Sequence, residues 1–290
     1  MFNGALSAII TPLRDGVVDE PALRDLIEWQ IQNGVDGIVP CGSTGESATL
    51  SHSEHERVIK IAVEQARKRV PVVAGTGSNS TAEAIRLTSF AREIGADGAL
   101  LVSPYYNRPT QDGIVRHFRA IAQSVSLPLV IYNIPSRTGS MVLPETLAQL
   151  ADVQNIVGVK EASGSMDQTS DIRRLCGERL TILSGDDSLT LPLIALGAKG
   201  VVSVISNVMP RETHDLTAAA LSGDIARARE LHYKMLPLVR ALFLETNPIP
   251  VKYAASLMGK CTAEMRMPLT TMSPGPAEKL RGVMKELRLI

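Results

Sequence analysis

The chain has 290 residues, of which 44% are hydrophobic, a size that suits one large domain or a domain with an appendage. Its 30 basic residues balance its 30 acidic ones, so it lacks the charge typical of proteins that bind nucleic acid or an anionic membrane, and we expect small-molecule ligands. The three cysteines are odd in number and far apart, and there is no leader-like start and no apolar run of ~18 residues, so we expect a soluble cytoplasmic protein without disulfides.

Short apolar runs alternate with amphipathic helical segments along the chain. The runs are rich in Val, Ile and Leu without strict polar alternation, which is typical of parallel strands covered on both faces. The eight runs begin near Ser7, Asp36, Val70, Asp97, Leu127, Ile156, Thr181 and Gly200.

The segments between the runs carry signals for the starts and ends of helices. The Ser-x-x-Glu segments 51–54 and 80–83 fit the capping box, in which a hydroxyl and a carboxylate satisfy free backbone amides reciprocally. Gly34 and Gly95 follow helical stretches and suit the left-handed position just beyond a helix.

Eight strand–helix units predict a (β/α)8 TIM barrel of the α/β class, which would form the catalytic domain, residues 1–223. Residues 224–290 read as a C-terminal helical appendage or domain. A doubly wound open sheet uses the same alternation and is the alternative, but eight units favour the barrel. Segment 75–80 lacks the third glycine of a dinucleotide site, and His52 and His55 lack a third ligand, so we expect neither a cofactor nor a metal.

In such a barrel the functional residues lie where strands end and the following loops begin. The second strand is followed by Gly42, Ser43, Thr44 and Gly45. The glycines permit a tight turn, and the hydroxyls and amides suit a carboxylate, although an ordinary Gly/Ser turn is the alternative.

Three of the five tyrosines fall at the ends of the fourth and fifth strands, as Tyr105, Tyr106 and Tyr132. A phenol beside an amine can transfer protons, and a guanidinium such as that of Arg137 can bind a carboxylate through paired hydrogen bonds. The alternative is that the tyrosines cap the barrel mouth and that the arginine forms a surface ion pair.

Lys160 ends the apolar sixth strand. Burial disfavours the ammonium form of lysine, and the neutral amine forms a Schiff base with a carbonyl carbon. Gly158 shares its face of the strand, which we expect to leave room for a substrate, and the seventh strand ends in a small polar turn at 184–187. A strand-end lysine that extends to solvent is the alternative.

Four segments, 42–46, 105–109, 132–138 and 159–162, resemble the dihydrodipicolinate synthase family in order and spacing over essentially the whole chain. The resemblance implies a lyase of the Schiff-base aldolase superfamily that condenses pyruvate with L-aspartate-4-semialdehyde. The product would be 4-hydroxy-tetrahydrodipicolinate, in diaminopimelate and lysine biosynthesis.

The same resemblance implies roles for individual residues. Lys160 would form the imine with pyruvate, and Tyr132 would be the general acid/base. Thr44 and Tyr106 would complete a proton relay, and Tyr106 would reach the site across a dimer interface, which implies a homodimer and usually a homotetramer. The resemblance also implies residues that bind the substrates. Ser43 and Thr44 would bind the pyruvate carboxylate, and Arg137 would bind the semialdehyde carboxylate. Gly185 and Val202 would line the pyruvate pocket.

Feedback inhibition by free lysine at the dimer interface is also implied by the resemblance. Helix capping and interface packing are the alternative explanation of the residues concerned. The matching positions are Ser47, Ala48, Leu50, His52, His55, Asn79, Glu83 and Tyr105, with Glu83 as the partner of the ligand's ammonium group.

Ser43 departs from the family, because most synthases have threonine there and N-acetylneuraminate lyases also show Ser-Thr. Arg137 favours the synthase, because it would contact the part of the substrate that differs. An N-acetylneuraminate lyase or a 2-keto-3-deoxy sugar acid aldolase that releases pyruvate stays an alternative. A non-catalytic pyruvate or lysine sensor is the alternative from another class.

Overall fold

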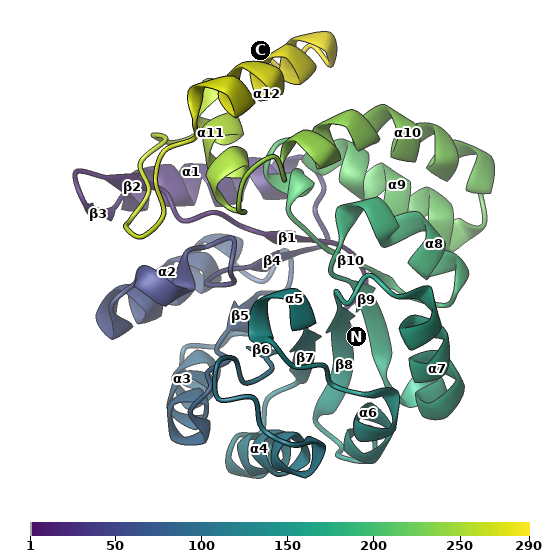
Figure 1. Ribbon diagram of the computed structural model, residues 1–290. Coiled ribbons are helices and arrows are strands. Elements are labelled where there is room, and N and C mark those ends of the chain that lie inside the picture. Colours follow the sequence, from purple (N-terminus) through teal and green to yellow (C-terminus); the bar gives the residue numbers. More distant parts are fainter. Residues whose placement is uncertain (1) are drawn as a thin grey trace.

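The computed structural model describes residues 2–290, and eight parallel strands form its centre (Figure 1). They pair in the order β4-β1-β10-β9-β8-β7-β6-β5. The ring closes between its first and last members, where Ile38 bridges Val72 and the Gly75 amide donates to the Pro40 carbonyl at 2.9 Å. The predicted (β/α)8 barrel is confirmed, and the open doubly wound sheet is wrong. The strands are β1 (Gly4–Ala8), β4 (Gly37–Val39), β5 (Val73–Gly75), β6 (Gly98–Val102), β7 (Leu129–Asn133), β8 (Ile156–Glu161), β9 (Thr181–Ser184) and β10 (Gly200–Ser203).

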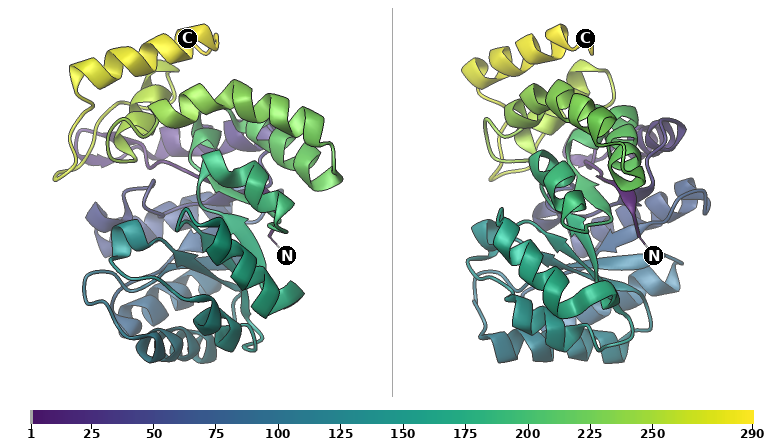
Figure 2. Two further views of the ribbon diagram at one scale, coloured as in Figure 1. Left: turned by 45° about the vertical axis from the view of Figure 1, so that its right-hand side comes forward. Right: turned by 90° about the vertical axis from the view of Figure 1, so that its right-hand side faces the viewer.

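Helices surround the barrel, as the views of Figure 2 show. Those of the barrel are α1 (Glu20–Gln32), α2 (His52–Ala66), α3 (Thr81–Glu93), α4 (Gln111–Ser124), α5 (Pro135–Thr138), α6 (Pro144–Leu150), α7 (Met166–Cys176), α8 (Thr190–Ala195) and α9 (Pro210–Ser222). Short elements complete it: the hairpin β2 (Leu13–Arg14) and β3 (Val17–Val18), and the 3₁₀ turns η1 (Ser47–Thr49), η2 (Gly177–Arg179), η3 (Asp187–Leu189) and η4 (Ile205–Asn207).

Three helices follow the barrel: α10 (Ile225–Ala241), α11 (Ile249–Leu257) and α12 (Pro274–Glu286). The predicted C-terminal helices are therefore present, and α12 packs against α10 and α11 at the end marked C in Figure 1. The division into domains at residue 223 stays a prediction. Within residues 2–290, no helix is both long and apolar enough to span a bilayer.

Two apolar cores follow from the alternation of side chains along the strands. The larger core lies between the sheet and the helices and includes Ile38, Phe118 and Ile131. The smaller one is formed by side chains such as Leu6, Val130, Tyr132 and Val202, which fill the inside of the barrel as layers of branched residues usually do. A side chain at the end of this inner core is therefore both dry and close to the barrel mouth.

The first strand begins at Gly4, earlier than the expected start near Ser7. Gly4 to Ser7 pair with Gly200 to Ser203 of β10, and this pairing fixes the start. Ile10 belongs to the apolar run that begins near Ser7, but it lies beyond the strand, and its amide donates to the Asn207 side chain at 3.0 Å.

The capping box at Ser51 and Glu54 is confirmed in both directions. The second box is half wrong, because Ser80 caps the Glu83 amide but the Glu83 carboxylate accepts a hydrogen bond from Ser78 instead of from the Ser80 backbone. Gly34 and Gly95 have the left-handed φ values expected beyond helix ends, +85° at each.

Candidate active site

Lys160 and Tyr132 face each other on neighbouring strands inside the barrel. The two residues are register partners of β8 and β7, so their side chains leave the sheet on the same face. The Lys160 amine lies 4.0 Å from the centroid of the Tyr132 ring. Lys160 is only 5% exposed, so the alternative of a lysine that extends to bulk water is wrong.

Burial changes the acidity of both side chains. It lowers the pKa of Lys160 to about 8, against the opposing effect of the Asp186 and Asp187 carboxylates. Burial also raises the pKa of the Tyr132 phenol, with Asp186 adding to the effect and Arg137 opposing it. Near neutral pH the site therefore holds an amine that is partly uncharged beside a phenol that keeps its proton, a pairing suited to nucleophilic attack and proton transfer.

Gly185 lies beside Lys160, and its lack of a side chain is what the packing there requires. A Cβ at Gly185 would come within 2.5 Å of the Ala162 Cβ and within 3.2 Å of the Lys160 Cε. The expectation for Gly158 was wrong, because a Cβ there would meet the Thr181 carbonyl oxygen at 2.8 Å. Gly158 permits close strand packing, and Gly185 leaves the space at the amine.

The turn after β4 presents Ser43 and Thr44. The Gly45 amide donates to the Gly42 carbonyl at 3.0 Å and the Glu46 amide donates to the Ser43 carbonyl at 3.2 Å, so the turn is closed by its own backbone. Thr44 is buried, and its hydroxyl accepts a hydrogen bond of 3.1 Å from the Asn247 side chain.

A cavity of about 640 Å³ extends from this turn toward α2 and α3. Ser43 and Arg137 line it, and Arg137 donates to the Asn247 carbonyl at 2.8 Å. The cavity lining does not include Tyr132, Lys160, Thr44, Gly185 or Val202. Tyr132 and Val202 belong to the inner core of the barrel.

Seven of the eight positions assigned to lysine binding line the same cavity: Ser47, Ala48, Leu50, His52, His55, Glu83 and Tyr105. Asn79 is outside the lining, but its side chain donates to the Tyr105 carbonyl at 3.2 Å. The Nδ1 atom of buried His55 has no hydrogen-bond partner, and burial lowers the pKa of this ring to about 4. The cavity therefore offers the Glu83 carboxylate and a neutral imidazole to a ligand.

Within one chain, Tyr106 lies apart from the other residues predicted to form the site. Its side chain is 90% exposed, and it is not part of the cavity lining. Its backbone has φ +71°, a left-handed conformation that non-glycine residues seldom adopt.

Asn247 and Lys252 contact the predicted site, and sequence reasoning missed both. Asn247 links Thr44 and Arg137, and Lys252 forms a buried ion pair with Glu46. One signal was available for Lys252, because it lies three residues from both Ile249 and Ala255, on the buried face of α11. A lysine on an apolar helix face indicates a buried partner.

The model of the dihydrodipicolinate synthetase family matches residues 1–287 of this chain. A curated relative, 4-hydroxy-tetrahydrodipicolinate synthase of Syntrophus aciditrophicus (strain SB), is 60% identical over 290 residues that cover both proteins completely.

Solved structures agree with that match. A dihydrodipicolinate synthase from Acinetobacter baumannii, complexed with pyruvate, is 44% identical with a TM-score of 0.98, and the comparison covers 100% of both chains. A synthase of the same kind from Cyanidioschyzon merolae, with lysine bound, is 41% identical with a TM-score of 0.97 and covers 100% of this chain and 99% of its own.

Proposed function

The chain belongs to the dihydrodipicolinate synthetase family, and from that premise we propose that it condenses pyruvate with L-aspartate-4-semialdehyde to 4-hydroxy-tetrahydrodipicolinate. It is a lyase of the Schiff-base class. The observation that carries the mechanism is the Lys160 amine, buried against the Tyr132 ring with its pKa lowered to about 8.

In the proposed reaction the neutral Lys160 amine attacks the keto carbon of pyruvate and water leaves, which forms an imine. Protonation of the imine nitrogen gives an iminium, which withdraws electrons, so the pyruvate methyl group loses a proton and the adduct becomes an enamine. The enamine attacks the aldehyde carbon of the second substrate and forms the carbon–carbon bond. The amino group of that substrate then attacks the imine carbon, which closes the ring and frees the Lys160 amine.

We assign the proton transfers to Tyr132, with Thr44 and Tyr106 as its relay. Ser43 and Thr44 would bind the pyruvate carboxylate through hydroxyls and amides, beside a pocket wall of Gly185 and Val202. The closed turn at Gly42 to Glu46 and the space at Gly185 support these assignments.

The test of the function is a coupled assay with pyruvate and aspartate semialdehyde, run beside assays with N-acetylneuraminate and 2-keto-3-deoxy sugar acids. We expect turnover only in the first. Cleavage of a sugar acid with no reaction of the semialdehyde would contradict the proposal. An unmodified Lys160 after borohydride treatment with pyruvate would instead support a non-catalytic sensor.

Arg137→Leu should raise the KM for aspartate semialdehyde by about 10- to 100-fold, because a charged hydrogen bond contributes about 1.5–3 kcal/mol. Arg137 is exposed and lines the cavity, whereas Lys160 is buried outside that lining, so the pyruvate adduct should form as before. Steady-state kinetics with each substrate varied measures both effects. Arg116→Leu, which removes an exposed guanidinium paired with Asp112 on α4, is the control. A rise in the pyruvate KM alone would contradict the assignment.

We propose that free L-lysine binds in the cavity beside the site and inhibits the enzyme, with Glu83 holding its ammonium group. The shared lining and the lysine-bound synthase of C. merolae support this. Added lysine should lower the rate of the coupled assay, and Glu83→Gln should raise the inhibitory concentration about tenfold or more. A rate that does not respond to lysine would contradict the proposal.

We propose a homodimer or homotetramer in which Tyr106 completes the site of a neighbouring subunit, because this side chain is almost fully exposed in one chain. Sedimentation should show dimers or tetramers, and a fully active monomer would contradict the proposal.

The cytoplasm stays the proposed location of the protein, and the three free cysteines support a reducing compartment. Recovery of the protein in a periplasmic or membrane fraction would contradict this location.

A further inference from the structure

Glu46 and Lys252 form an ion pair that is closed to solvent. The Lys252 Nζ lies 2.5 Å from the Glu46 Oε1, and the side chains are 0% and 1% exposed, respectively. Removing two charges from water has a large free-energy cost, and a well-packed apolar pair of similar volume is often at least as stable. Stability alone therefore does not explain why a charged pair occupies this buried position.

Glu46 is part of the turn that carries Ser43 and Thr44. Its amide closes the turn by donating to the Ser43 carbonyl at 3.2 Å. Its backbone is left-handed, with φ 55° and ψ 33°, a conformation that non-glycine residues keep only where the surroundings impose it. The conformation of Glu46 and the position of the two hydroxyl residues are therefore linked.

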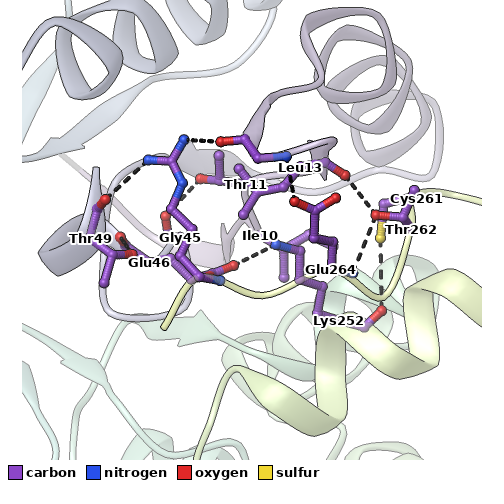
Figure 3. Close-up of polar contacts among 12 residues, drawn as sticks. Ile10, Thr11, Leu13, Gly45, Glu46, Thr49, Lys252, Cys261, Thr262 and Glu264 are labelled. Carbon is purple, nitrogen blue, oxygen red and sulfur yellow. Dashed lines mark hydrogen bonds and ion pairs between the residues drawn. The ribbon is translucent and has the colours of Figure 1, made fainter. Parts of the chain in front are cut away.

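The surroundings that hold Glu46 come from the C-terminal part of the chain (Figure 3). One carboxylate oxygen is bound by Lys252 of α11, and the other accepts a hydrogen bond of 3.2 Å from the Arg266 amide. Arg266 is itself fixed, because its guanidinium donates to the carbonyls of Thr49 and Gly16 at 3.0 and 2.7 Å. Both oxygens of Glu46 are thus held by segments more than 200 residues away along the chain.

We propose that Glu46 is a positioning residue, which Lys252 and Arg266 hold so that the turn presents Ser43 and Thr44 to the pyruvate carboxylate. This inference rests on the proposed function. The C-terminal helices then set the affinity for pyruvate, although Lys252 and Arg266 contact no substrate. Asn247, two residues before α11, also holds this turn by its hydrogen bond to Thr44.

The test uses the full chain and three variants: Glu46→Gln, Lys252→Met and the two combined. Each is measured for its thermal unfolding midpoint, for kcat and KM, and for the pyruvate concentration that gives half-maximal borohydride trapping. Each single variant leaves one buried charge without its partner, so we expect a lower midpoint and a half-maximal concentration raised about tenfold or more.

The double variant separates a positioning role from a merely structural one. It leaves no unpaired charge, so its midpoint should return toward that of the unaltered chain. The pyruvate requirement should stay raised, because the turn has lost its contact with Lys252 of α11. Asn155→Ala is the matched control, because this side chain supports the carbonyls of Ala122, Val125 and Leu127 before β8, at the opposite end of the barrel. It should lower the midpoint without changing the pyruvate requirement.

Two results would overturn the inference: a pyruvate requirement in the double variant equal to that of the unaltered chain, or a requirement in Asn155→Ala raised as much as in the single variants. If the single variants fail to fold, the double variant alone decides. Absence of a trapped adduct in the unaltered chain would be different, because it would contradict the proposed function itself and the inference with it.

Discussion

Lys160→Ala should abolish the borohydride-stable pyruvate adduct and lower kcat by about 10³-fold or more, because the imine that activates pyruvate forms on this amine. No hydroxyl or phenol in the site can replace the amine, because neither forms an electron-withdrawing iminium with pyruvate. Mass spectrometry of the intact chain after reduction measures the adduct, and the coupled assay measures kcat. Lys199→Ala is the control, because Lys199 precedes β10 at the far end of the barrel and its amine lies 4.0 Å from Glu178.

The pH dependence of trapping tests the same residue in the unaltered chain. Below a pH of about 8 the Lys160 amine is mainly the ammonium form, which cannot attack a carbonyl, and above it mainly the neutral form. The rate of adduct formation should therefore rise with pH through about 8 and then level off. An adduct that persists in Lys160→Ala, or a rate that keeps rising toward the ordinary lysine pKa of about 10.4, would contradict this account of the site.

The barrel could be predicted because each strand is a short apolar run closed by a turn or by a helix signal. Such patterns are local, so the runs at Asp97, Leu127 and Ile156 led directly to β6, β7 and β8. The start of β1 was harder, because its limit depends on pairing with Gly200. An apolar run gives the presence of a strand, but the partner strand decides where it begins.

The site residues on strand ends were also predictable from local sequence, since a lysine at the end of a buried strand and a turn with two glycines are visible without a structure. Gly158 and Gly185 show the limit of this reasoning. Both flank Lys160, but the Thr181 backbone packs against the first, and the Lys160 side chain packs against the second. The role of each glycine depends on its neighbour in space.

The contacts from the C-terminal helices were outside the reach of sequence reasoning. Asn247 lies 203 positions from Thr44, and Lys252 lies 206 positions from Glu46. The prediction treated residues 224–290 as an appendage, because they read as helical and follow the eighth strand–helix unit. In the structure, Lys252 of α11 binds Glu46 in the turn that carries Ser43 and Thr44, so truncation of these helices is expected to affect substrate binding as well as stability.

Tyr132→Phe should lower kcat by about 10²- to 10⁴-fold, the usual contribution of a general acid/base. Phenylalanine keeps the ring that lies 4.0 Å from the Lys160 amine and keeps the packing of the inner core, so only the hydroxyl is lost. Burial raises the pKa of this phenol, so at neutral pH it is protonated and acts first as a donor. The coupled assay measures kcat, and trapping after long incubation measures imine formation.

The yield of trapped pyruvate separates proton transfer from a change in the shape of the site. If the phenol only transfers protons, the variant should form the adduct slowly but to the full yield, because the Lys160 amine and its surroundings are unchanged. Tyr253→Phe is the matched control, since it removes a hydroxyl that accepts from Arg281 at 2.7 Å between α11 and α12. A kcat for Tyr132→Phe equal to that of this control would remove Tyr132 from the chemistry. A lost adduct would instead mean that the phenol keeps the Lys160 amine neutral or accessible. Tyr132 would then act on the nucleophile and not as the group that transfers protons.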